Sequence, residues 1–288
     1  ALQLKVAGIC AIALAVLFLG SATMFVGVVM ALWQNVAKRL LAYSSVSQMG
    51  FILVGIGSAA YLAEGGSVGW TGTLLHVVNH ALFKGLLFLG LGAVIHATGE
   101  GDLRRLGGLW RRMPWTFAFV LIAVGGIAGL PGLNGFVSKS VLHHALAYAE
   151  GHHHLAALQW AEWVFTITTI GTAAALIKLL AMTFLGSARA DLGRPVHEAS
   201  WRMRLAMGAM AAAIVTFGLR PQLLAPVLAA GVEVYAASSA GVLGYVTSPI
   251  AHAADLRAAA TALTLGALVA WASARWRVFD RPPPVWLS

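Results

Sequence analysis

The segment that decides the fold reads Leu74-Leu75-His76-Val77-Val78-Asn79-His80-Ala81-Leu82-Phe83-Lys84. It lies within an apolar run, about residues 70–97, and about 20 apolar residues are enough for a helix to cross a bilayer core. His76, His80 and Lys84 follow one another at intervals of four, so a helix places them on one face. Titratable groups at bilayer depth are costly and mark ion or proton pathways. The segment predicts a membrane helix whose polar stripe carries protons or ions; the alternative is a structural polar contact between helices.

The whole chain has the composition of a polytopic membrane protein. Of its 288 residues, 59% are hydrophobic and 10% are charged, whereas soluble domains carry about 25% charged residues. The mean hydropathy of +0.82 excludes both an ordinary soluble domain and a disordered chain. We attribute the net charge of +9 to loops that orient membrane helices, and not to nucleic-acid binding. The single cysteine, Cys10, leaves no disulfide framework.

Seven apolar segments are long enough to span a bilayer, so we expect an all-α bundle of about seven transmembrane helices. They are residues 6–30, 40–61, 70–97, 115–148, 158–186, 203–219 and 258–276. The fourth segment is too long for one straight span, and Gly129, Pro131 and Gly132 at its centre predict a discontinuous helix. Such a break at membrane depth must be buried in protein or line a wet cavity. Residues 222–247 are expected to lie on the surface or to re-enter the membrane.

Lysine and arginine are concentrated in alternate loops between these segments. The opposite loops hold Arg220 and Arg257 together with Glu64, Glu150 and a run of three histidines at 152–154. Because positive loops stay on the cytoplasmic side, this asymmetry predicts cytoplasmic basic loops and a cytoplasmic C-terminus. We expect a multi-pass protein of a bacterial inner membrane.

Two further lysines occupy positions suited to proton transfer. Lys38 stands beside the second apolar segment, and Lys139 follows the helix break, with His143 one turn later on the same face and His144 adjacent. A desolvated lysine can release its proton, whereas arginine cannot, and histidine relays protons near neutral pH. The predicted proton pathway therefore comprises Lys38, His76, His80, Lys84, Lys139 and His143.

No catalytic, cofactor-binding or metal-binding residue is assigned. The sequence contains no nucleophile elbow, phosphate loop or dinucleotide fingerprint. The histidine run at 152–154, with Glu150, is interpreted as a solvated loop and not as a zinc site, because consecutive histidines do not easily face one ion.

Three segments resemble a known family. The segment Ala37-Lys38-Arg39-Leu40-Leu41-Ala42-Tyr43-Ser44-Ser45-Val46-Ser47-Gln48-Met49-Gly50-Phe51 is similar to a signature of the antiporter-like proton-pumping subunits. These include the L, M and N subunits of complex I, Mrp-type sodium/proton antiporter subunits and membrane subunits of energy-converting hydrogenases. His76 to Gly90 resembles the family's central-lysine helix, and Leu130 to Lys139 resembles its broken helix.

The resemblance implies a fold of two inverted five-helix repeats. Residues 1–186 resemble the second repeat, and residues 187–288 would be additional C-terminal helices and a tail. The first repeat is missing, so an N-terminal half of the bundle is expected from the same gene or from a separate chain. Half a bundle is expected to expose its polar stripe to lipid.

The resemblance also implies roles for the pathway residues. Lys84 would be the central proton-carrying lysine, His76 and His80 relay groups, Lys139 the outlet switch, and Lys38 the start of the axis. The function implied is proton translocation by an antiporter-like subunit of a complex I, Mrp or hydrogenase-type assembly, with other membrane subunits as partners. Such a subunit of a proton-translocating NADH–quinone oxidoreductase-like complex carries no cofactor and does no redox chemistry itself. The alternatives are secondary sodium/proton exchange and a non-conducting assembly role in which polar residues only join helices.

Overall fold

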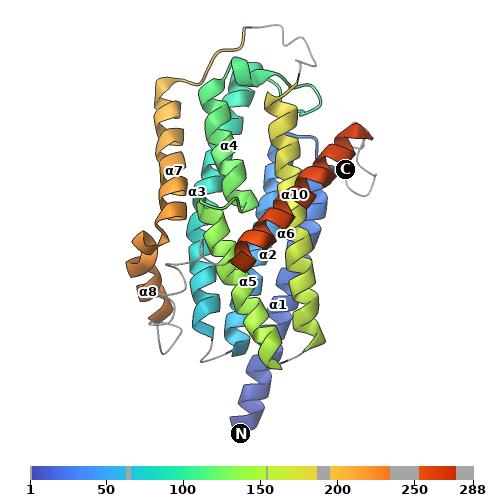
Figure 1. Ribbon diagram of the computed structural model, residues 1–288, viewed down its shortest axis with the longest axis vertical. Helices are drawn as coiled ribbons and strands as arrows, with labels where there is room; N and C mark the ends of the chain where they lie inside the picture. The colour runs from blue at the N-terminus through green and yellow to red at the C-terminus, as the bar shows by residue number, and fades with distance from the viewer. Residues whose placement is uncertain (1, 63–65, 154, 187–194, 234–252, 277–288) are drawn as a thin grey trace.

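A computed structural model shows an all-α bundle, described for residues 2–62, 66–153, 155–186, 195–233 and 253–276 (Figure 1). The long helices are α1 (Leu2–Trp33), α2 (Ala37–Leu62), α3 (Ser67–Thr98), α4 (Pro114–Ala128), α5 (Asn134–His153), α6 (Ala156–Phe184), α7 (Trp201–Leu219) and α10 (Ala253–Arg275). Shorter elements are η2 (Leu109–Arg111), η3 (Pro221–Leu224) and α8 (Ala225–Glu233). The described residues contain no strand beyond an isolated bridge between Val36 and Asp102.

Six helices in the described part of the chain are long and apolar enough to cross a membrane: α1, α2, α3, α6, α7 and α10. Helices α4 and α5 follow one another in the same direction along the bundle and form one discontinuous crossing (Figure 1). The expected all-α membrane bundle with one broken helix is therefore confirmed. Each expected segment lies within a few residues of its helix, because apolar length alone fixes membrane spans well.

Helices α1 and α2 pack with almost no space between their backbones. A Cβ atom added to Gly57 would lie 2.7 Å from the backbone nitrogen of Leu17, and one added to Gly20 would lie 2.7 Å from that of Val54. Small residues permit such close approach between membrane helices, where dispersion contacts replace the hydrophobic effect as the driving force. The pair forms one wall of the bundle.

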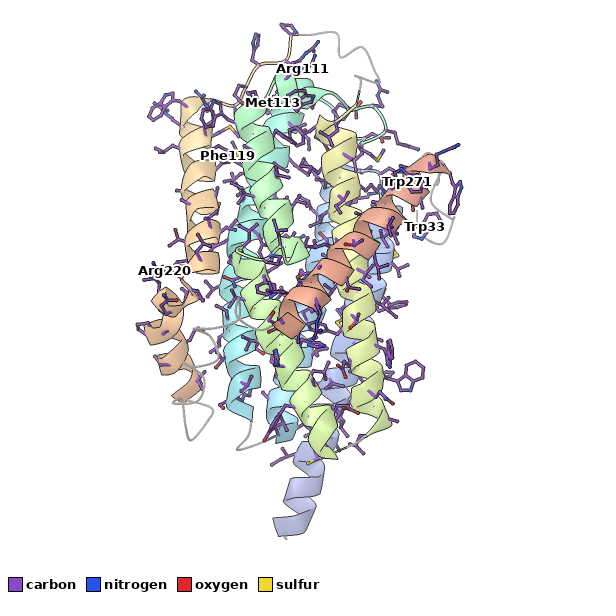
Figure 2. The ribbon with its side chains drawn as sticks, viewed as in Figure 1. Trp33, Arg111, Met113, Phe119, Arg220 and Trp271 are labelled. Atoms are coloured by element: carbon purple, nitrogen blue, oxygen red, sulfur yellow. The ribbon has the colours of Figure 1, made fainter. Side chains whose placement is uncertain are left out.

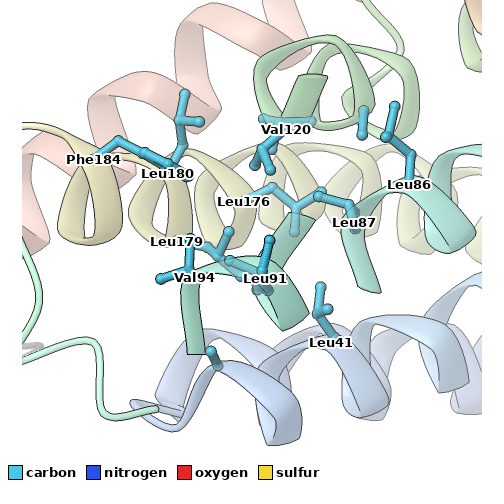
Figure 3. Close-up of a cluster of buried hydrophobic side chains, with 14 of the residues drawn as sticks. Leu41, Leu86, Leu87, Leu91, Val94, Val120, Leu176, Leu179, Leu180 and Phe184 are labelled. Atoms are coloured by element: carbon cyan, nitrogen blue, oxygen red, sulfur yellow. The ribbon is translucent and has the colours of Figure 1, made fainter. Parts of the chain in front are cut away.

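An apolar core fills the half of the bundle nearer the basic loops. Figure 3 shows Leu41 of α2, Leu91 of α3, Val120 of α4 and Leu176 of α6 converging on this region. These four side chains are 2% exposed or less. The core packs α2, α3, α4 and α6 together at this end of the bundle.

The basic loops gather at one end of the bundle, where Arg111 lies in Figure 2. There Glu198 caps α4: its carboxylate accepts hydrogen bonds from the backbone nitrogen of Trp115 at 2.8 Å and from Oγ1 of Thr116 at 2.6 Å. In the same region Asp102 accepts a 2.6 Å bond from Arg104, which holds the pKa of that carboxyl below its ordinary value.

The C-terminal helices pack around this bundle. Helix α7 lies beside α3 and α4, and η3 and α8 continue in the same direction along α3, so Arg220 lies partway along the bundle (Figure 2). Residues 222–233 of the segment expected to lie on the surface or to re-enter the membrane are thus helical and pack on α3, whereas its remaining residues, 234–247, lie outside the described residues. Helix α10 crosses the face of α6 obliquely (Figure 1).

Candidate functional site

Lys84 of α3 is buried against α2. Its side chain is 4% exposed, and its Nζ donates a 2.9 Å hydrogen bond to the backbone oxygen of Leu41 and a second bond to Oγ of Ser44. Both acceptors are neutral. Lys84 is therefore held at the middle of the bundle by oxygen dipoles instead of a carboxylate.

His76, two turns before Lys84, connects three helices. It is fully buried, with Nε2 3.2 Å from Oε1 of Gln48 on α2 and Nδ1 3.0 Å from Oγ of Ser138 on α5. With its proton on Nε2, the ring donates to Gln48 and accepts from the Ser138 hydroxyl. Each ring nitrogen thus has a partner on a different helix, as a group that relays protons requires.

His80 lies between these two residues on the same face of α3. Its ring centroid is 6.4 Å from that of His76, and its Nε2 is buried without a hydrogen-bond partner among the described residues. This distance is too long for a direct hydrogen bond between the rings but short enough for one bridging water. His80 is the least enclosed member of the stripe, because the surface of α3 beside it, at Val77 and Ala81, is exposed.

The discontinuous helix brings Lys139 close to the level of His76 in the bundle. Helix α4 ends at Ala128, and Gly129 and Gly132 adopt φ angles of +84° and +87°, which glycine accepts without strain. The ended helix leaves backbone carbonyls without helical partners, and Lys139 Nζ donates a 2.8 Å bond to one of them, the oxygen of Ile127. The ammonium also lies 5.1 Å from the centroid of the Phe51 ring.

An asparagine pair fixes the start of α5. Asn79 of α3 donates a 2.8 Å bond from Nδ2 to the backbone oxygen of Asn134, and Asn134 Nδ2 donates a 3.1 Å bond to Asn79 Oδ1. Both side chains are 1% exposed or less. The stripe of α3 and the break in the fourth span are therefore tied directly to each other.

A cavity of about 80 Å³ lies at the break, beside Lys139. It is lined by Ala128 and Gly129 at the end of α4 and by residues of α5, α6 and α10, including His143 and Asp255. Because one water needs roughly 10–15 Å³ of such space, the cavity has room for several. At this end of α5, His143 Nε2 is 3.4 Å from Oε1 of Glu162, and His144 Nε2 is 2.8 Å from Oδ1 of Asp255.

The structure brings most of the sequence-predicted residues together. His76, His80 and Lys84 lie on one face of α3, His76 is bonded to Ser138 beside Lys139, and Lys139 and His143 line one cavity. Lys38 stands apart: it is exposed at the first turn of α2, one turn before Leu41.

The expected exposure of the polar stripe to lipid is wrong for two of its three members. His76 and Lys84 are 4% exposed or less within this chain alone, because α2 and α5 cover the face of α3 that carries them. The expectation treated α3 as facing a missing partner, whereas its polar face turns toward its own repeat.

Sequence reasoning gave Ser44, a partner of Lys84, a possible role in holding water, but it assigned no role to the other side-chain partners of these residues. Ser138 and Asn79 lie within the two quoted motifs, so their positions on the helix faces were available as a signal. Gln48 lies two turns after Leu41 in the signature of α2. Asp255 lies in a segment without any motif, and only the packing of α10 reveals it.

The comparisons with known proteins concern the family and the fold. The family described as NADH:quinone oxidoreductase/Mrp antiporter, TM, matches residues 4–184. The NADH-ubiquinone oxidoreductase chain 5 of Metridium senile is 35% identical over 193 residues, covering 66% of this chain and 30% of the relative. Hydrogenase-4 component B of Escherichia coli is 37% identical over 220 residues, covering 73% of this chain and 33% of the relative.

A solved structure extends the likeness to the C-terminal helices. The Mrp complex from Dietzia sp. DQ12-45-1b contains a chain that matches with a TM-score of 0.74 and 26% identity, over 93% of this chain and 28% of that chain. The present chain thus spans about a third of the length of these relatives. The match over residues 4–184 places it, with the broken helix and the lysines of α3 and α5, in the NADH:quinone oxidoreductase/Mrp antiporter family of membrane subunits.

Proposed function

We propose that the chain translocates protons across a membrane, as an antiporter-like subunit of a multi-subunit complex, along the axis Lys84, His80, His76, Lys139 and His143. The observation that supports this most strongly is the setting of the two inner lysines. Lys84 and Lys139 are 5% exposed or less, and in the part of the chain that the structure describes neither forms a salt bridge with a carboxylate. An ammonium buried without a counter-ion is costly, so these positions suit a group that gains and loses its proton.

The proposed mechanism is electrostatic. A proton on Lys84 raises the energy of a second positive charge at His80 and His76, because like charges repel strongly in a medium of low dielectric constant. Arrival of a proton at one lysine therefore favours departure from the next. The His76 ring, bonded to Gln48 and Ser138, would accept a proton on one nitrogen and release it from the other.

Entry and exit follow from the positions of the end groups. Lys38 is exposed at the basic end of the bundle and would take part in entry, whereas His143 lies beyond the break and would take part in exit. Because basic loops stay on the cytoplasmic side, we propose uptake from the cytoplasm of a bacterial inner membrane. The first half of the bundle would come from the same gene or a partner chain, since this chain spans about a third of its relatives.

The test compares proton uptake by inverted membrane vesicles that contain the assembled complex, with Lys84→Gln against the native protein. Glutamine removes the titratable group but keeps polar contact with Leu41 and Ser44, so we expect proton uptake to fall at least tenfold at unchanged abundance of the complex. His96→Gln is the matched control, because His96 lies on α3 but is exposed in its last turn.

Unchanged uptake in Lys84→Gln would refute the proposal and leave the polar stripe a contact that only joins helices. The same vesicles, assayed with and without sodium, separate proton pumping from sodium/proton exchange. Uptake that needs no sodium supports the pump, and uptake that depends strictly on sodium supports exchange.

A further inference from the structure

We infer that Asp255 of α10, with His144 of α5, forms a proton-binding pair that receives the proton leaving Lys139 and passes it to the side opposite the basic loops. The inference rests on the proposed proton transport and extends it to a helix outside the five-helix repeat expected at 1–186. It rests on three observations: a shared cavity, a buried carboxylate and a graded exposure of the pair.

The cavity connects donor and acceptor. Lys139 and Asp255 both line it, from α5 and α10 respectively, and His143 also lines it. The volume of about 80 Å³ accommodates a short file of water, which is enough to carry a proton between the two side chains. Lys139 and Asp255 are each 5% exposed.

The partner of Asp255 is a titratable group. His144 Nε2 lies 2.8 Å and 3.1 Å from the two carboxylate oxygens of Asp255. A carboxylate buried for purely structural reasons is best neutralised by arginine, which keeps its charge at all relevant pH values. Histidine with aspartate forms a pair of charge −1 that becomes neutral when it binds one proton, so the pair can hold a proton and release it.

The exposure of the pair is graded toward the surface. The side chain of Asp255 is 5% exposed, whereas that of His144 is 33% exposed. Asp255 therefore faces the cavity and His144 faces outward. Because α5 runs from the break to the end of the bundle opposite the basic loops (Figure 1), His144 lies farther toward that end than Lys139 does, as an outlet requires.

The transfer balances without any further reactant. The Lys139 ammonium loses one proton and becomes a neutral amine, water in the cavity carries the proton, and the His144–Asp255 pair gains it as imidazolium and carboxylate. Loss of that proton to the outside restores the neutral imidazole. The charges that surround the pair are His143 with Glu162, Lys139 across the cavity, and Arg257 on α10, which is exposed.

The experiment measures proton uptake by inverted vesicles containing the assembled complex, across a range of pH, for Asp255→Asn, Asp255→Glu and Lys84→Gln. Asparagine preserves the size of the side chain and a hydrogen bond to His144 but cannot complete the charged pair. We expect Asp255→Asn to lower uptake at least tenfold and to shift its pH profile, and Asp255→Glu to recover most of the rate. Arg275→Gln, an exposed charge in the last turn of the same helix, is the matched control and should behave as the native protein.

Native uptake and an unchanged pH profile in Asp255→Asn, with uptake lost in Lys84→Gln, would overturn the inference and leave the proposed function standing. Native uptake in both variants would overturn the proposed function as well. Loss of uptake in Asp255→Asn that Asp255→Glu fails to recover, with an unshifted pH profile of the residual rate, indicates a structural contact and also overturns the inference.

A second measurement applies where Asp255 variants fail to assemble. Ser140 lines the cavity and is 7% exposed, so Ser140→Cys in a Cys10→Ser background reports on access of water to the cavity. A membrane-impermeant thiol reagent should label this cysteine from the side opposite the basic loops. Labelling only from the basic side, or from neither side, would overturn the inference.

Discussion

Replacing Asn79 by leucine tests whether the asparagine pair holds the helix break. Leucine has the same number and branching of side-chain heavy atoms as Asn79, although it is bulkier, and it removes both hydrogen bonds to Asn134, at 2.8 Å and 3.1 Å. The Asn134 side chain, which is 0% exposed, then keeps a buried amide donor that has lost its acceptor.

The magnitude follows from these two losses. Hydrogen bonds between membrane helices contribute about 0.6 kcal/mol each on average, and a stranded buried donor costs roughly 1–3 kcal/mol. The sum is about 2–4 kcal/mol, of which the lower bound corresponds to roughly a thirty-fold shift in an equilibrium. We expect the effect to be local, because the bonds join α3 to the first residue of α5.

The assay is hydrogen exchange of the intact complex, read by mass spectrometry over peptides that cover residues 126–140. Exchange there should rise at least thirty-fold in Asn79→Leu, because exchange reports the free energy of local opening. Proton uptake should fall with it, since Lys139 lies five positions after Asn134 on the same helix. In the double variant Asn79→Leu/Asn134→Leu the stranded amide is removed, so part of the protection should return.

The matched control is Thr71→Val. The Thr71 hydroxyl is also buried on α3, but it bonds to Ser67 within the same helix, so its loss should change exchange at residues 126–140 less than threefold. An equally small change in Asn79→Leu would refute the reasoning, because the break would then be held by its apolar packing alone.

Two further predictions concern the basic end of the bundle. Glu198→Ala should destabilise the start of α4 by about 1–2 kcal/mol, because the carboxylate accepts hydrogen bonds from donors in the first turn of the helix. Thermal unfolding of the complex measures this loss, and Glu198→Gln should keep part of the stability. Asp102 has a lowered pKa in the folded chain, mainly through its hydrogen bond from Arg104, so its contribution is present above the unfolded-state value of 3.8 and is lost as pH falls below it. Asp102→Asn should therefore lower the unfolding temperature more at pH 7 than at pH 3, and an equal loss at both pH values would contradict this.

The sequence predicted the fold well because its signals are local. Apolar length located each span, and Gly129, Pro131 and Gly132 located the break. Both features act through the chain's own backbone: a helix needs length, and a break needs glycine and proline. The match of residues 4–184 to a single family confirmed the resemblance drawn from three short motifs.

The site was predictable only where its residues share a helix. The interval of four residues in α3 placed His76, His80 and Lys84 together, but nothing in the sequence shows that Gln48 and Ser138 meet His76 from two other helices. Such contacts depend on helix rotation and tilt, which packing between helices decides. The same limit explains why the stripe was expected to face lipid: a single helix does not show which of its neighbours covers it.

The partners of the titratable groups differ along the proposed path. Lys84 and Lys139 are bonded to neutral oxygens, whereas His143 and His144, beyond the break, face Glu162 and Asp255. A positive charge beyond the break is therefore offset by a nearby carboxylate, whereas one on either lysine is not, and attraction between opposite charges is strong away from bulk water. In the proposed path this difference would draw the proton from Lys139 toward the carboxylates, one of which belongs to α10. It follows that α10, although outside the repeat that carries the lysines, would set the direction of release.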